Sequence, residues 1–171
     1  MTKDDIVGVY RTIGDDTVSA GGTITSDNSR TAQIMYSPDG YMAVVSMPNG
    51  RALTAQWSGG PDLNAATPEE RAEAAKGMVC YAGRYELKDG EVHHHIEMAL
   101  NPNAVGQTIV RRAAINGPDL TLSSVPDAQG NYRRIRWRRV GDVPAVRLSP
   151  FELLRSLGSH VLSEFRHDFL R

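Results

Sequence analysis

Residues 80–100 read CYAGRYELKDGEVHHHIEMAL, and this stretch decides the fold class. Two short runs rich in aromatic, aliphatic and β-branched residues flank Lys88-Asp89-Gly90, a tripeptide that favours a tight turn. The pattern predicts two strands, Cys80–Leu87 and Glu91–Leu100, joined at this turn. Similar turn signals recur along the chain, so we expect an antiparallel sheet of short strands.

The other predicted strands lie on both sides of this pair. The remaining turn signals are Pro38-Asp39-Gly40, Pro48-Asn49-Gly50, Asn116-Gly117-Pro118-Asp119 and Ala128-Gln129-Gly130-Asn131. Between them we predict strands at residues 6–12, 31–37, 41–46, 51–56, 106–115, 119–123 and 132–140. Eight or nine short strands with tight turns are typical of a sandwich or an up-and-down barrel.

A short helix interrupts the strands at about residues 68–77. Thr67 can cap its first turn, Pro68 suits the first helical position, and Glu70 completes a capping box. The small side chains that follow bury little surface, so we expect this helix to close a barrel end rather than to build the core.

A second helix is predicted at the C-terminus. Ser149-Pro150-Phe151-Glu152 forms another capping box, and an apolar stripe follows on one helix face. We therefore predict a barrel domain over residues 1–145 and an amphipathic helix over residues 149–171. Its apolar face needs a partner surface, which is the outside of its own barrel or, alternatively, a homodimer or another protein.

Composition narrows the class of function. The chain has 171 residues, 40% of them apolar, which suffices for one core. Its 19 basic and 20 acidic side chains nearly cancel, so no positive field favours nucleic acid. It contains no apolar run long enough to span a membrane, and MTKDDIVGVY does not resemble a secretory signal, so we expect a cytoplasmic protein without membrane contact. Cys80 is the single cysteine, which excludes an intrachain disulfide.

The three adjacent histidines are the first candidates for chemistry. On a strand, His93, His95 and Glu97 share one face and His94 takes the other. The face of His94 also holds Val92, Ile96, Met98 and Leu100. Because this face is apolar, we predict that His94 points into the lumen. Burial there lowers the pKa of the imidazole and favours the neutral form.

Other interpretations of the histidines stay open. His94 could be a core histidine that is hydrogen-bonded to a neighbouring tyrosine or backbone carbonyl. A register shift of one residue would instead place His93 and His95 in the lumen. His93, His95 and Glu97 form an acceptable metal-ligand set on the outer face, although we expect no metal.

Aromatic side chains supply the predicted ligand contacts. In a lumen, a phenol adds apolar surface and a hydroxyl group that orients a ligand. Trp137 would form an apolar wall, while the alternating arginines around it would be solvated rather than bind RNA. The predicted ligand-binding residues are Tyr36, Tyr41, Tyr81, Arg84, Met98 and Trp137.

Segments spread along the chain carry a family resemblance. They are Ile6-Val7-Gly8-Val9-Tyr10-Arg11, Tyr36-Ser37-Pro38-Asp39-Gly40-Tyr41-Met42, Thr67-Pro68-Glu69-Glu70, Tyr81-Ala82-Gly83-Arg84-Tyr85, residues 92–97, Asn101-Pro102-Asn103-Ala104-Val105-Gly106, Leu120-Thr121-Leu122 and Trp137-Arg138-Arg139. Together they resemble the bacterial and fungal lipocalin-like domain family over residues 5–140. The resemblance implies a closed antiparallel lipocalin-like β-barrel of eight or nine strands.

The resemblance also implies how one barrel end is closed. The opening motif of the family has a tryptophan that plugs this end under an arginine from a late strand. Tyr10 stands in its place here, and Arg136 or Arg138 would cover it.

These observations predict that the lumen binds an apolar or amphipathic small metabolite. By analogy with relatives of the fold in natural-product pathways, we expect a cofactor-independent cyclase, isomerase or lyase-type enzyme. His94 would transfer the proton. The alternatives are a non-catalytic carrier or sensor, and an interaction module that works through residues 149–171.

Overall fold

The computed structural model describes residues 1–52 and 63–141. The strands are β1 (Gly8–Val18), β2 (Ile24–Asp27), β3 (Arg30–Tyr36), β4 (Tyr41–Pro48), β5 (Val79–Lys88), β6 (Glu91–Ala99), β7 (Thr108–Asn116), β8 (Asp119–Ser123) and β9 (Tyr132–Arg139). The helices are α1 (Lys3–Ile6) and α2 (Pro68–Ala75), with 3₁₀ turns at Leu63–Ala65 and Pro102–Ala104.

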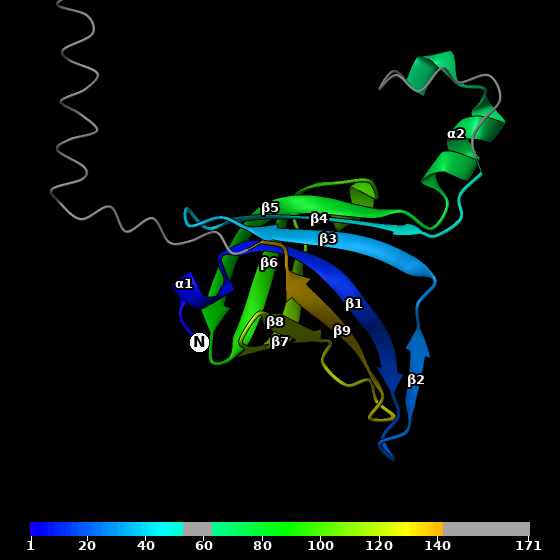
Figure 1. Cartoon of the computed structure of the whole chain (residues 1–171). Helices are drawn as coiled ribbons and strands as arrows, with labels where there is room; N and C mark the ends of the chain where they lie inside the picture. Colours follow the sequence, from blue (N-terminus) through cyan, green and yellow to red (C-terminus); the bar gives the residue numbers. More distant parts are fainter. Residues whose placement is uncertain (53–62, 142–171) are drawn as a thin grey trace, which may run out of the picture. The chain divides into compact units, whose positions relative to one another are not determined.

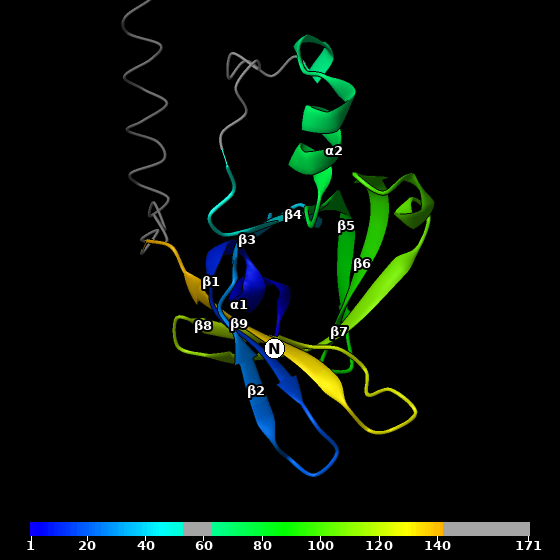
Figure 2. The same ribbon diagram turned by 90° about the vertical axis from the view of Figure 1, so that its right-hand side faces the viewer.

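The described strands form one antiparallel sheet that closes on itself. The strand order is β2-β1-β3-β4-β5-β6-β7-β8-β9, and β1 also pairs with β9. Eight strands therefore make a barrel, and β2 is added beside the second half of β1. The hairpin of β1 and β2 lies next to β9 in both views (Figures 1 and 2). The predicted mainly β, closed antiparallel barrel is confirmed.

Several element boundaries differ from the prediction. β1 continues to Val18 instead of ending at residue 12, and neither α1 nor β2 was expected. Arg51 and Ala52 lie in neither helix nor strand, and the rest of the strand predicted at residues 51–56 falls outside the described residues. The helix predicted at residues 149–171 also lies outside them.

The capping box predicts α2 correctly. The Glu70 backbone N–H donates to the Thr67 hydroxyl at 3.2 Å, and the Thr67 backbone N–H donates to the Glu70 carboxylate at 3.0 Å. The helix ends at Ala75 and buries none of its residues. No helix in the described part of the chain has the length and apolar character to cross a bilayer.

One end of the barrel is closed by α1 and a tyrosine plug. Ile6 and Tyr10 are buried, and the Tyr10 hydroxyl donates to the Ile6 carbonyl at 3.0 Å. The Arg139 guanidinium lies 4.7 Å from the centre of the Tyr10 ring and donates to the carbonyls of Val7 and Asp5. The arginine over the plug is thus Arg139, and the expectation of Arg136 or Arg138 is wrong.

Strand register explains this correction. Arg139 is the direct cross-strand partner of Tyr10 and shares the inward alternation of Trp137. Arg136 and Arg138 occupy the alternate positions of β9 and point to the outer face. Their guanidinium groups bind Asp16 and Asp119, respectively.

A bulge in β1 fixes where its two aspartates point. Thr12 pairs with Trp137 and Gly14 pairs with Arg136, so Ile13 is the extra residue on β1. The extra residue reverses the alternation, which directs Asp15 inward and Asp16 outward. Gly14 leaves room for the Arg136 guanidinium, because a Cβ at this position would collide with it.

Asp16 joins three strands where the barrel closes. Its side chain is 1% exposed and accepts hydrogen bonds from Ser26 of β2 at 2.7 Å and from Arg134 of β9 at 2.8 Å. Arg136 approaches the same carboxylate at 3.2 Å. Burial acts to raise the pKa of this carboxyl, but the two hydrogen bonds and the arginine charges outweigh it and lower the pKa.

A second bulge lies between β5 and β6. Gly83 pairs with Ile96 and Ala82 pairs with Met98, so Glu97 is the extra residue on β6. A Cβ on Gly83 would collide with the His95 carbonyl oxygen, so the close approach of the two backbones requires glycine. Even-numbered residues of β6 point inward before this bulge, as His94 and Ile96 do, whereas Met98 after the bulge points outward.

Replacing Asp16 by Asn should lower the free energy of unfolding by about 2 kcal/mol, because two guanidinium groups lose their shared counter-charge at the closure. Urea unfolding at neutral pH measures the change. Asp119→Asn is the matched control, because Asp119 of β8 also binds an arginine of β9, Arg138, but this pair is exposed and contributes little. Equal effects of the two substitutions would contradict the role of Asp16.

Candidate functional site

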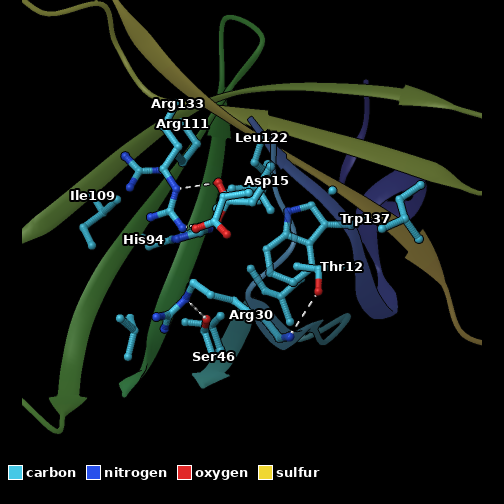
Figure 3. A pocket seen from close by; sticks show the side chains of 18 of the residues that line it. Thr12, Asp15, Arg30, Ser46, His94, Ile109, Arg111, Leu122, Arg133 and Trp137 are labelled. Atoms are coloured by element: carbon cyan, nitrogen blue, oxygen red, sulfur yellow. Dashed lines mark hydrogen bonds and ion pairs between the residues drawn. The ribbon is translucent and has the colours of Figure 1, made fainter. Parts of the chain in front are cut away.

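The lumen contains a cavity of about 350 Å³. Its apolar wall includes Ile34, Val44, Ile109, Leu122, Ile135 and Trp137. Its polar side chains include Thr12, Asp15, Arg30, Ser46, Tyr81, His94, Arg111 and Arg133 (Figure 3). A mainly apolar pocket with a few convergent polar groups suits a small amphipathic molecule, and this volume lies near the lower end of the range for ligand pockets.

His94 lies in the wall of this cavity and is bound on both ring nitrogens. The alternation of β6 turns it inward between Val92 and Ile96, and it is 1% exposed. Its Nε2 lies 2.8 Å from the Tyr36 hydroxyl, and its Nδ1 lies 3.1 Å from the Tyr81 hydroxyl. The three side chains form a continuous hydrogen-bonded chain from β3 through β6 to β5.

The donors and acceptors of this chain fix the tautomer of His94. Tyr36 is 2% exposed, and within the described residues its hydroxyl has no hydrogen-bond partner other than His94. The phenolic hydrogen of Tyr36 must therefore be donated to Nε2, since a buried donor without an acceptor is costly. Nδ1 then carries the imidazole proton and donates to the Tyr81 oxygen. The hydroxyl hydrogen of Tyr81 remains free to be donated to a ligand in the cavity.

The environment keeps all three groups of the chain uncharged at neutral pH. Burial, and after it the positive charge of Arg111, lowers the pKa of His94 to about 3. Burial also raises the pKa of Tyr81 and raises that of Tyr36 well above its ordinary value. His94 is consequently a poor proton acceptor and a good neutral relay.

Arg111 is a cation without a carboxylate partner in the described part of the chain. It points inward from β7 and lines the cavity, and its Nη1 donates to the Val110 carbonyl at 3.0 Å. Burial lowers its pKa. Arg133, drawn beside it in Figure 3, is instead bound through two nitrogens to the carboxylate of Asp15.

Trp137 lines the cavity with its ring, and its indole donor is buried away from the cavity surface. Its side chain is 3% exposed and its indole Nε1 has no hydrogen-bond partner among the described residues. Buried indole N–H groups normally find an acceptor.

The structure brings four of the predicted site residues together. His94, Tyr81 and Trp137 line the cavity as expected, and Tyr36 lies at the other end of the hydrogen-bonded chain through His94. Their roles toward a ligand stay predictions.

The expected lumenal position of Tyr41, Arg84 and Met98 is wrong. Tyr41 and Arg84 are direct partners on the outer face, 45% of Tyr41 is exposed, and the Arg84 guanidinium lies 5.1 Å from the centre of its ring. They face outward because the inward positions of β4 and β5 are Met42 and Gly83. Met98 lies beyond the bulge at Glu97, which reverses the alternation and leaves it 64% exposed.

His93 and His95 lie on the outer face and pair with neighbouring carboxylates. His93 lies 3.3 Å from Glu91, and His95 lies 3.4 Å from Glu86. Glu97 pairs with Arg84 at 3.4 Å instead of joining them. In residues 1–52 and 63–141, no three histidine, cysteine or acidic side chains are grouped for a metal ion.

Five charged residues of the cavity were not predicted: Asp15, Asp27, Arg30, Arg111 and Arg133. Arg111 alternates with Ile109, Ala113 and Ile115, and this apolar pattern could have placed it inside. Arg133 likewise shares the alternation of Trp137. The residue pattern did not indicate that Asp15 faces the cavity, because only the bulge at Ile13 turns its side chain inward.

The pKa of His94 predicts how stability depends on pH. The unfolded chain binds a proton below about pH 6.5, whereas the folded chain resists it down to about pH 3. Stability from neutral His94 is thus present above pH 6.5 and is lost as the pH falls, by up to about 1.4 kcal/mol per pH unit.

Urea unfolding between about pH 7 and pH 4.5 should show this slope, and His94→Gln should reduce it by about one proton. NMR titration of the His94 ring in the unaltered chain provides a check that does not depend on the variant. Protonation of the ring near pH 6 would contradict the assignment.

The chain matches one family model and is similar to solved structures. The family model of the lipocalin-like domain matches residues 23–140. A lipocalin-like protein from Bacteroides uniformis is similar at 13% identity and a TM-score of 0.41, over 80% of this chain and 99% of that chain. A protein from Bacteroides eggerthii is similar at 10% identity and a TM-score of 0.40, over 79% of this chain and 99% of that chain. No curated protein matches the sequence.

The family match covers β2 to β9, which include the strands that carry Tyr36, Tyr81, His94, Arg111 and Trp137. It extends over more than half of the chain, and the strands it covers form most of the closed barrel. The chain belongs to the lipocalin-like domain family.

Proposed function

We propose that the barrel binds a small apolar or amphipathic metabolite in its lumen and acts on it as a cofactor-independent cyclase, isomerase or lyase. The observation that carries this proposal is the hydrogen-bonded chain Tyr36–His94–Tyr81 in the wall of a mainly apolar cavity. A barrel fold alone would not distinguish an enzyme from a carrier.

Tyr81 is the group that would meet the substrate. Its hydroxyl hydrogen is free, and its oxygen accepts from His94 Nδ1 in the tautomer derived above. A hydrogen bond from Tyr81 to a carbonyl or other oxygen of the substrate would stabilise negative charge that develops on that oxygen while a proton moves within the substrate. In an isomerisation or cyclisation the proton lost at one atom of the substrate is regained at another, so Tyr81 keeps its own proton and the site is restored.

His94 would act by relaying and orienting rather than as a base. With a pKa of about 3, the ring holds an extra proton poorly at neutral pH. Its two hydrogen bonds instead fix the Tyr81 oxygen and stabilise negative charge that develops there. The apolar wall would hold a flexible substrate in one reactive conformation, which supplies part of the rate enhancement by itself.

A non-catalytic carrier or sensor is the second candidate. Both nitrogens of His94 are satisfied by protein phenols, as in a structural core histidine. In that case the cavity binds the same class of molecule and releases it unchanged.

Tyr81→Phe separates the two candidates, because it removes the hydroxyl and keeps the ring. The purified chain is incubated with a metabolite extract of its source cells, and depleted and newly formed masses are recorded by mass spectrometry. An enzyme predicts conversion that falls about 100-fold or more in Tyr81→Phe. Tyr41→Phe is the matched control, because that phenol lies on the outer face, and it should convert normally. Absence of any conversion by the unaltered chain would support the carrier.

A further inference from the structure

We infer that the lumenal ligand is a small carboxylic acid with an apolar body, and that Arg111 binds its carboxylate. This inference rests on the proposed function, because it assigns a chemical class to the molecule in the same cavity.

Arg111 is half-buried, and within the described residues no carboxylate provides a counter-charge for it. Its cross-strand partner Val92 is fully buried, and burial opposes the positive charge of the guanidinium. Within the described residues its single hydrogen bond is to a neighbouring backbone carbonyl. A guanidinium offers five N–H donors in a fork that matches a carboxylate, so most of its binding capacity is unused.

Three other arginines of the barrel have a carboxylate as counter-charge. Arg133, Arg134 and Arg138 each bind an aspartate through two nitrogens. Arg111 differs from them because it faces the cavity without such a carboxylate among the described residues.

No carboxylate in the cavity wall is free to take this role. Asp15 is bound by Arg133 through both of its oxygens. Asp27, the other acidic residue of the wall, is exposed and accepts from the Ser29 backbone. The groups that face Arg111 are the neutral Tyr36, Tyr81 and His94, and Arg133 adds a second positive charge.

The charge balance of the cavity therefore favours an anion. Within the described residues its wall contains three arginines and two aspartates, which leaves one net positive charge. In an apolar cavity an unpaired charge is costly, and an anionic ligand removes that cost.

Trp137 and the aliphatic side chains beside it supply an apolar surface next to Arg111. The apolar body would pack on Ile109, Leu122 and Ile135.

The test compares two probes of the same shape, 4-phenylbenzoate and 4-phenylbenzamide, by calorimetric titration of the full chain near neutral pH. The unaltered chain should bind the acid at least about 10-fold more tightly than the amide. Arg111→Met keeps the side-chain length and removes the charge, so it should bring the acid to the affinity of the amide. Arg112→Met is the matched control, because the neighbouring side chain is exposed, and it should keep the preference.

The outcomes separate this inference from the proposed function. Equal binding of acid and amide, or a preference that survives Arg111→Met, overturns the role of Arg111 and leaves lumenal binding intact. Failure of both probes to bind the unaltered chain overturns lumenal binding as well. If Arg111→Met does not fold, Arg111→Lys serves instead, since it keeps the charge without the fork and should retain part of the preference.

Discussion

The pairing of β1 with β9 is the interaction on which the rest of the structure depends. It turns an open sheet into a barrel, places Arg139 over Tyr10 at one end, and brings Trp137 and Arg133 into the same lumen as His94. Asp16 stabilises this closure from outside, where β2, β1 and β9 meet. The bulge at Ile13 is required as well, because it sends one aspartate to the closure and the other to the cavity.

Inside the barrel, polar groups that have protein partners lie beside one that lacks a counter-charge among the described residues. The tyrosine and histidine chain is neutral and hydrogen-bonded throughout, apart from the hydroxyl hydrogen of Tyr81 that is free for a ligand. Arg111 lines the cavity and lacks a carboxylate partner within the described residues. A charged group without a counter-charge destabilises the folded chain unless a ligand binds it, so the location of Arg111 favours a ligand-binding role over simple packing.

Much of the fold and part of the cavity wall could be predicted from the sequence, because local patterns such as the alternation of side chains along a strand were kept in the structure. The turn at Lys88-Asp89-Gly90, the capping box at Thr67, and the inward position of His94 all follow from local rules that tertiary structure did not override. The same rule applies to Arg111, which alternates with Ile109, Ala113 and Ile115, but an arginine on a strand is usually solvated.

The failures have two physical causes. Bulges at Ile13 and Glu97 reverse the alternation, and the nearby glycines Gly14 and Gly83 do not show which residue is the extra one. Asp15 was therefore missed, and Met98 was assigned to the wrong face. The prediction that Tyr41 and Arg84 face the lumen rested on their side-chain chemistry, whereas the register of their strands directs both side chains outward. The additional strand β2 consists of exposed residues and carries no burial signal.

Native mass spectrometry of the chain purified from its own host tests the central claim most directly. The account predicts that the folded protein carries a small molecule that is released on denaturation. A folded chain that shows its sequence mass alone, before and after denaturation, would contradict a ligand-holding lumen.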